Sequence, residues 1–295
     1  MNRRMVLTIG MMFAIMATIG AGVWAGLSIS PAYLEVSLDQ GRPAGEFYIT
    51  NIGTAEERYR ISAVAFRFTE EGLLERLAPN DQQLAAWIIF NPKEFVLPAG
   101  TRRIVRFVIA PHGVLQEGEY AAAMELESLN TQTATSVDKK GRSMKIKIVS
   151  TIMVPIFAQT GKVLFSAAAS DAQLVRRGEQ ASVVLAVSNT GSAHIATMGK
   201  FEIVNGEGQS VVNGNFPKTY ILRQSKRLFD VPLSTTLPTG NYSIRAQLSS
   251  AQLSGPIVYE GPLTLKTIAP TTQVLSPPVQ PRIAATQGAR PTTVP

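Results

Sequence analysis

Few side chains in this sequence have the type and spacing that catalysis needs. The chain has 295 residues, with two histidines and no cysteine. His112 follows Pro111 and His194 follows the turn Asn189–Gly191, so neither has a second histidine at metal-ligand spacing. The lack of cysteine excludes disulfides, thiolate nucleophiles and thiolate metal sites. We therefore assign both histidines to surface or turn positions.

The carboxylates do not form a catalytic pair either. Glu56 and Glu57 are adjacent in sequence, as are Glu70 and Glu71. Adjacent residues of a strand point to opposite faces, so the members of each pair cannot share a proton. The glycines of Gly206–Gly208 do not match a phosphate-binding pattern. The sequence predicts a protein that is not an enzyme, with no catalytic residue, metal site or cofactor.

The net charge of +7 does not indicate a nucleic-acid partner once the charges are located. Arg3 and Arg4 lie near the start and Arg282 and Arg290 near the end, in segments without Asp or Glu. Seven minus four leaves +3 for the rest of the chain, which is typical of an ordinary solvated surface. We expect protein partners and no nucleic acid.

The first 25 residues are typical of a secretory signal peptide. A basic start at Asn2–Arg4 precedes an uncharged apolar run from Val6 to Ile19, and Val23–Ala25 ends in a small residue. We expect cleavage after Ala25 and a periplasmic or extracellular mature protein. The alternative is an uncleaved anchor, because the run to Ala25 is about 20 residues long and just sufficient to span a bilayer. Membrane contact is expected only through this segment.

Short strands separated by turns fill the next part of the chain. Phe47 and Ile49 alternate with more polar neighbours, and the turn at Asn51–Gly53 predicts a hairpin with the strand that follows, Tyr59–Phe66. Pro31 lacks an amide hydrogen and is expected at an edge or where a strand switches sheets. These positions indicate antiparallel sheets.

Two connecting segments complete the first half. Asp81–Ile89 is the one expected helical turn, with Asp81 as its cap. Asn130–Ser143 is an expected polar loop. Because short strands recur without a βαβ alternation, the sequence predicts an all-β fold of two tandem immunoglobulin-like antiparallel sandwiches.

The longest strand pattern runs from Met144 to Gln159, near the middle of the chain. Its even positions are apolar except Ser150, and its odd positions begin with Lys145 and Lys147, which is the period of a strand with one committed face. The apolar positions that matter below are Ile146, Ile148, Ile152 and Val154. Since turn residues follow this strand, we expect it to close the first domain.

Two landmarks recur in the second half. An Asn-x-Gly turn follows an apolar strand at Asn51 and again at Asn189, and a Gly precedes a strand-entry Tyr by two residues at Tyr120 and at Tyr242. The repeat suggests a duplicated module. The tyrosines are expected as corner residues whose hydroxyls bind the backbone. We expect a signal peptide at 1–25, a first sandwich at 26–160, a second at 161–267 and a disordered proline- and threonine-rich tail at 268–295.

Several segments of the first half resemble the first domain of PapD-like periplasmic pilus-assembly chaperones. They are SISPAYLEVSL, FYITNIGTAEERYRISAVAF, NPKEFVLPAGTRRIVRFVIAP, EGEYAAAMELES and the long strand that ends in VPIFAQ. The resemblance covers about residues 27 to 160, and this chain is similar to a divergent member of that superfamily. It implies an immunoglobulin-like fold and a periplasmic chaperone.

The resemblance also implies how a partner is bound. In that family the last strand of the first domain is lent to a pilus subunit that lacks its own final strand. Ile146, Ile148, Ile152 and Val154 are the matching partner-binding positions. The alternative is that these side chains fill the core of their own sandwich, as in any last strand.

The family also holds the subunit's terminal carboxylate with an Arg and a Lys in its cleft. Here Glu35 lies near the Arg position and Met153 near the Lys position, so both basic anchors are expected to be absent. A glutamate there repels a carboxylate.

The hypothesis that follows is an exported chaperone-like protein that assists assembly of pilus or surface subunits. The main alternative is a structural or adhesive cell-envelope protein whose modules present loops. A third reading is a carbohydrate- or protein-binding accessory of an enzyme complex.

Overall fold

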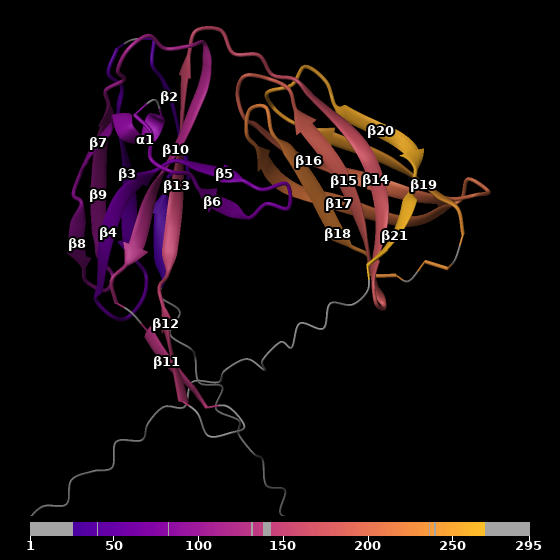
Figure 1. The fold of residues 1–295 in the computed structure, drawn as a ribbon, viewed down its shortest axis with the longest axis horizontal. Helices are drawn as coiled ribbons and strands as arrows, with labels where there is room; N and C mark the ends of the chain where they lie inside the picture. The colour runs from indigo at the N-terminus through magenta and orange to yellow at the C-terminus, as the bar shows by residue number, and fades with distance from the viewer. Residues whose placement is uncertain are drawn as a thin grey trace, which may run out of the picture.

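The computed structural model describes residues 26–268, apart from 40, 82, 131, 138–142, 236 and 239. For 132–137 and 143–148 it describes the backbone alone. The expected signal peptide and nearly all of the expected tail lie outside the described residues. The described chain forms two β-sandwiches in succession, as Figure 1 shows from indigo to yellow. The all-β, two-sandwich fold class is confirmed.

The first sandwich packs a four-stranded sheet against a five-stranded one. The four-stranded sheet has the order β1 (Leu27–Ser30), β3 (Ala44–Asn51), β9 (Arg102–Ile109) and β7 (Ile88–Asn91). The five-stranded sheet has the order β2 (Leu34–Ser37), β13 (Thr151–Thr160), β10 (Gly118–Ser128), β4 (Glu57–Val64) and β8 (Glu94–Leu97). Its pairs are antiparallel, except for β2 with β13.

The period of two along the strands explains why the sheets close on one core. Val105, Phe107 and Ile109 are buried from β9, and Met124 and Leu126 are buried from β10 on the facing sheet. Burying a side chain of this size contributes about 1.5–3 kcal/mol. A slip of one residue would turn every one of these side chains to the solvent, so the pattern fixes which face is inward.

The predicted hairpin at Asn51–Gly53 is wrong. β3 pairs with β1 and β9, whereas β4 pairs with β10 and β8, so the turn carries the chain from one sheet to the other. The Asn51 amide donates to the carbonyls of Ala55 (2.7 Å) and Leu97 (2.9 Å), and its Oδ1 accepts from the Gly53 N–H. The apolar period did not distinguish the two arrangements, because both strands face the same core from opposite sides.

The expectation for Pro31 is confirmed. β1 ends at Ser30 in the four-stranded sheet and β2 begins at Leu34 in the five-stranded sheet, so the chain switches sheets at this proline. Proline has no N–H to pair in either ladder, which suits the crossing point.

A short helix, α1 (Leu84–Trp87), lies where a helical turn is expected. Its N-cap is Gln83, so the assignment of Asp81 as the cap is wrong; the Asp81 carbonyl instead accepts from Trp87 Nε1 at 2.8 Å. No helix in the described part of the chain has the length and apolar character to span a membrane.

Two hairpins extend the first sandwich. β5 (Phe66–Phe68) with β6 (Leu74–Arg76) points toward the second sandwich, and β11 (Gln132–Val137) with β12 (Ser143–Ile148) projects beyond the first (Figure 1). The expected polar loop at 130–143 is therefore wrong over 132–137. This polar segment forms a strand because β12 offers it an antiparallel partner from Ile148 back to Ser143.

The second sandwich has two four-stranded sheets. One has the order β18 (Lys226–Pro232), β15 (Gln180–Asn189), β14 (Ala167–Arg177) and β21 (Thr264–Ile268). The other has the order β17 (Ser210–Ile221), β16 (Ile195–Asn205), β19 (Tyr242–Ser249) and β20 (Ile257–Pro262).

The two tyrosines are corner residues, as expected. Tyr120 donates its hydroxyl to the Gln116 carbonyl (3.2 Å) and accepts from the Gln116 N–H (2.9 Å). Tyr242 donates to the Pro238 carbonyl (3.1 Å). In both sandwiches the hydroxyl thus binds the backbone four residues upstream.

The described parts of the two sandwiches touch in two regions. At the tip of the β5–β6 hairpin, the Glu70 carbonyl accepts from the Leu228 N–H of β18 (2.7 Å), and the Glu70 carboxylate pairs with Lys226 (3.4 Å). Near the connection between the sandwiches, the Glu119 N–H donates to the Ser192 carbonyl (2.9 Å). The second region includes His194, which is described below.

Candidate functional site

β13 is paired on both sides over only part of its length. It pairs with β10 from Thr151 to Thr160, but with β2 only from Ile156 to Gln159. No other described strand pairs with Thr151–Pro155 on the β2 side. This stretch is a free edge in a sheet that is otherwise continuous across β13.

Two hydrogen bonds show which backbone groups of β13 face this edge. The carbonyl of Ser150 accepts from the Ser128 N–H on the β10 side (2.9 Å), and the carbonyl of Gln159 accepts from the Leu38 N–H on the β2 side (2.7 Å). Antiparallel pairing alternates residue by residue. Even-numbered residues of β13 therefore bond toward β10, and odd-numbered residues toward the β2 side.

The open edge thus presents the N–H and C=O groups of Thr151 and Met153. A proline fits position 155 because its missing N–H is one that would otherwise point into solvent. Such a row of unpaired backbone groups is a template for another strand.

The predicted partner-binding residues on β13 differ in burial. Val154 is 1% exposed and belongs to the core of the first sandwich, together with Ile156 and Ala158. Ile152 is 38% exposed, at the end of the strand where the core stops. Val154 is held by its own sandwich, whereas Ile152 retains surface that a partner can cover.

The other two predicted residues lie on a separate strand. Ile146 and Ile148 belong to β12, opposite Ala134 and Gln132 of β11. The expected single strand from Met144 to Gln159 is therefore wrong. Between the Glu127–Thr151 pair and the Gln132–Ile148 pair, the chain has four residues on one side and two on the other, so the ladder is interrupted there.

Of the two expected anchor positions, Glu35 lies beside the second sandwich and Met153 lies next to β10 of the first. Glu35, on β2, pairs with Phe157 of β13, and its Oε1 lies 3.4 Å from Nε2 of His194. Met153 pairs with Glu125 of β10. Neither position carries a cation.

Glu125, the residue opposite Met153, forms an ion pair with Arg76 of the β5–β6 hairpin. Arg76 binds Glu125 with two nitrogens, Nε at 2.7 Å from Oε2 and Nη2 at 2.8 Å from Oε1. Burial raises the pKa of Glu125, and the Arg76 guanidinium opposes that rise. The carboxylate of Glu125 is thus already neutralised by a residue of the same sandwich.

Sequence reasoning missed the position of His194. The structure places it in the joint between the sandwiches, 1% exposed, with Nδ1 2.7 Å from Oε2 of Glu119. Its ring stacks on Phe157 with centroids 3.8 Å apart. The sequence carried no signal for this, because Glu119 and Phe157 are far from His194 along the chain. His112 is not among the residues of this joint.

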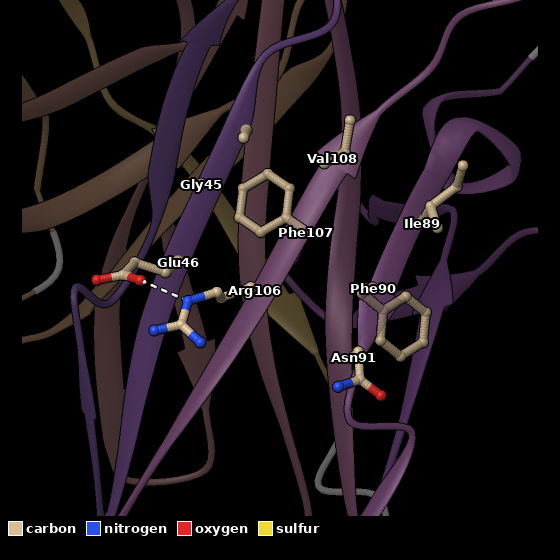
Figure 2. A pocket seen from close by; sticks show the side chains of 9 residues that line it. Gly45, Glu46, Ile89, Phe90, Asn91, Arg106, Phe107 and Val108 are labelled. Carbon is tan, nitrogen blue, oxygen red and sulfur yellow. Dashed lines mark hydrogen bonds and ion pairs between the residues drawn. The ribbon is translucent and has the colours of Figure 1, made fainter.

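A pocket on the first sandwich is lined mainly by apolar residues and glycine. It has a volume of about 540 Å³, and Figure 2 shows that β3, β7 and β9 line it. Glu46 and Arg106 form an ion pair at 3.2 Å on its rim. Gly45 lies against the Phe107 ring, where an added Cβ would be 2.5 Å from the ring. None of the nine lining residues is a histidine, serine, threonine or cysteine.

Within the described residues, no group of three or more His, Cys, Asp or Glu side chains is arranged to hold a metal ion. Among the described residues, we take the free edge of β13 as the candidate functional site.

Comparison with known proteins gives structural likeness without sequence similarity. No protein-family model matches the chain, and no curated protein sequence matches it. A chain of the CsuC–CsuE chaperone–tip adhesion subunit pre-assembly complex, from the archaic chaperone-usher Csu pili of Acinetobacter baumannii, is 14% identical, with 82% of this chain and 100% of that chain covered and a TM-score of 0.44.

Two further solved structures give similar values. A chain of the Salmonella enterica SafA pilin–SafB chaperone complex is 12% identical, with 82% and 99% covered and a TM-score of 0.43. The E. coli chaperone DraB is 13% identical, with 81% and 97% covered and a TM-score of 0.39.

Proposed function

We propose that this protein is an exported, non-enzymatic chaperone-like factor that binds pilus or surface subunits through the free edge of β13 and the adjoining β12. The observation that carries the proposal is the stretch Thr151–Pro155, which is paired with β10 and open on its other side. A partner strand laid along it gains main-chain hydrogen bonds and extends the five-stranded sheet.

The unpaired edge is long enough for a partner strand to pair with it, because it continues from β13 into β12. β12 is paired with β11 on one side, and no other described strand pairs with it. The edge therefore runs from Ser143 through Pro155, broken only at 149–150. Most of it projects beyond the sandwich (Figure 1), so the sandwich's own sheets do not block a partner's approach.

The side chains divide the edge into a structural and a recognition part. Val154 fills the core of its own sandwich, so we assign it to folding and not to the partner. Ile152, half covered, and Ile146 and Ile148 on β12 are the positions we assign to the partner. Binding would not depend on a carboxylate clamp at positions 35 and 153, since Glu35 would repel a carboxylate there.

The test is capture from a periplasmic extract with the mature chain, followed by identification of the bound proteins by mass. Three baits are compared: the unchanged chain, Ile152→Lys, and Val258→Lys as the matched control. Val258 is 63% exposed on β20 of the second sandwich, so the control adds the same charge away from β13.

We expect the unchanged chain and Val258→Lys to retain subunits that lack a final strand, and Ile152→Lys to lose at least tenfold in affinity, which corresponds to about 1.4 kcal/mol. Capture that persists in a folded Ile152→Lys variant would contradict strand addition. A mature chain that fractionates with the envelope and captures no subunit would favour a structural or adhesive protein.

A further inference from the structure

His194 is enclosed between two carboxylates of the other sandwich. Its Nδ1 lies 2.7 Å from Oε2 of Glu119 on β10, and its Nε2 lies 3.4 Å from Oε1 of Glu35 on β2. His194 precedes β16 and belongs to the second sandwich, so the ring joins the two halves of the molecule. One side chain therefore contacts two acidic groups across the joint.

Glu119 depends on this ring for charge compensation. It is 2% exposed, and its oxygens accept from the His194 backbone N–H (2.9 Å) and from Gln159 Nε2 (3.0 Å). Among the described residues, no Lys or Arg lies within ion-pairing distance of it. Burying a carboxylate costs free energy unless a cation accompanies it. A positive charge on His194 therefore stabilises the buried carboxylate of Glu119.

The geometry distinguishes the neutral ring from the charged one. A neutral imidazole has one N–H, whereas an imidazolium has two. If the one proton is on Nδ1 facing Glu119, the lone pair of Nε2 faces Glu35. Nε2 is buried and has no hydrogen-bond partner in the described structure, so only the charge of an imidazolium makes its contact with Glu35 favourable.

The other titratable groups around the joint do not replace this charge. Tyr220 of β17 lies 6.0 Å from the His194 ring, and Tyr33 packs edge-on against Tyr220. Burial raises the pKa of Tyr220, so its hydroxyl stays protonated near neutral pH. Lys218 lies over the Tyr220 ring (5.8 Å) and Arg223 over the Tyr120 ring (5.6 Å), and neither forms an ion pair with the two carboxylates.

We infer that the joint between the two sandwiches is proton-linked: the His194 imidazolium holds Glu119 and Glu35 of the first sandwich, and loss of its proton releases the second sandwich from that orientation. The contact at the tip of the β5–β6 hairpin is made by Glu70, Lys226 and Leu228 and involves no histidine. A rise in pH therefore loosens the contact region around His194 and leaves the contact at the tip of the β5–β6 hairpin intact.

The inference can be tested by attaching spin labels to two introduced cysteines. Because the natural sequence has no cysteine, no other site is labelled. Val96→Cys on β8 and Val258→Cys on β20 place one exposed site on each sandwich, at 48% and 63% exposure. Spin labels at these sites report the distribution of distances between the sandwiches. We expect a narrow distribution at about pH 6 and a broader one at about pH 8.5.

Three variants identify the group responsible. His194→Gln is expected to abolish the pH response, and Glu35→Gln, at a half-exposed position that does not threaten folding, is expected to reduce it. His112→Gln, which removes the other histidine, is expected to leave it unchanged. In this last variant the histidine ring resonances come from His194 alone and are expected to shift over the same pH interval.

A distance distribution that does not change with pH would overturn the inference. So would a pH response that persists in both His194→Gln and Glu35→Gln, or a His194 ring that keeps one protonation state from about pH 6 to about pH 8.5. If His194→Gln fails to fold, Glu35→Gln and the ring resonances still decide the question.

Discussion

Asn189 makes in the second sandwich the same three hydrogen bonds that Asn51 makes in the first. The Asn51 amide donates to the carbonyls of Ala55 and Leu97, and its Oδ1 accepts from Gly53. The Asn189 amide donates to Ala193 (2.8 Å) and Ile221 (3.0 Å), and its Oδ1 accepts from Gly191 (2.9 Å). The recurring Asn-x-Gly motif is thus a repeated device that fixes how the chain leaves a strand.

Replacing either asparagine with alanine is expected to destabilise its sandwich. Each substitution leaves two carbonyls and one N–H without a partner at a buried site, so we expect a loss of about 2–3 kcal/mol in the free energy of unfolding. Urea unfolding of Asn51→Ala and Asn189→Ala measures this. A loss within error of zero for either would mean that water replaces the side chain.

The free edge of β13 can be tested through its backbone. Met153→Pro removes an N–H that faces the open edge, whereas Ile152→Pro removes one that bonds to β10. We expect Met153→Pro to keep nearly the stability of the unchanged chain but to lose subunit binding, and Ile152→Pro to lose about 3 kcal/mol of stability. Unfolding midpoints and subunit capture are measured together. Equal destabilisation by the two prolines would contradict the assigned edge.

The β5–β6 hairpin offers a matched pair of ion pairs. Arg76 pairs with Glu125, whose side chain is 5% exposed, and Arg67 pairs with Glu75, where both groups are largely exposed. Arg76→Ala leaves a buried carboxylate unpaired, so we expect a loss of about 2 kcal/mol near pH 7, against little change for Arg67→Ala.

The pH dependence of the Arg76→Ala effect follows from Glu125. Burial raises the pKa of this carboxyl, so a protonated Glu125 no longer needs the guanidinium. The loss of stability is therefore expected to shrink as the pH falls to about 4. Equal losses in Arg76→Ala and Arg67→Ala at both pH values would show that Glu125 reaches solvent in the variant.

Tyr59 makes a prediction at alkaline pH. Burial, with a smaller effect of Glu57, raises the pKa of this phenol from 10.0 to about 12. The folded state keeps the proton longer than the unfolded state, so the stability from Tyr59 is complete below pH 10 and is lost as the pH rises to about 12. The loss amounts to about 2 kcal/mol.

Comparison of Tyr59→Phe with the unchanged chain isolates this loss from other alkaline titrations. The phenylalanine retains the packing against Phe95, whose ring lies 5.9 Å away, and has no proton to lose. We expect the two unfolding curves to agree at pH 9 and to separate above pH 10, with the variant more stable. Curves that stay parallel to pH 12 would contradict the raised pKa.

Elements with local signals could be predicted from the sequence. The period-two rows of β9 and β10 fixed their buried faces, because side-chain alternation in a strand depends only on its own backbone. Pro31 marked the sheet switch because its missing N–H restricts it to such places. The corner tyrosines bind backbone groups four residues upstream, so their spacing in the sequence was sufficient to recognise them. The two Asn-x-Gly asparagines likewise bind groups two and four residues downstream, and each adds one hydrogen bond to a carbonyl that is distant in sequence.

Which strands are neighbours was not readable in the same way. The pattern around Asn51 fits a hairpin or a crossover, and only the pairing of β3 with β9 and of β4 with β10 decides for the crossover. The polar segment 132–137 became a strand because β12 lies opposite it. Such pairings depend on residues far away in sequence.

For the candidate site the division is the same. By itself the sequence determined an apolar face at Ile146, Ile148, Ile152 and Val154, and the lack of a cation at Glu35 and Met153. The tertiary structure decided that Val154 is buried, that Thr151–Pro155 is an open edge, and that His194 lies between Glu119 and Glu35. Periodicity is a property of one strand, whereas burial, pairing and charge compensation are set by neighbours that only folding brings together.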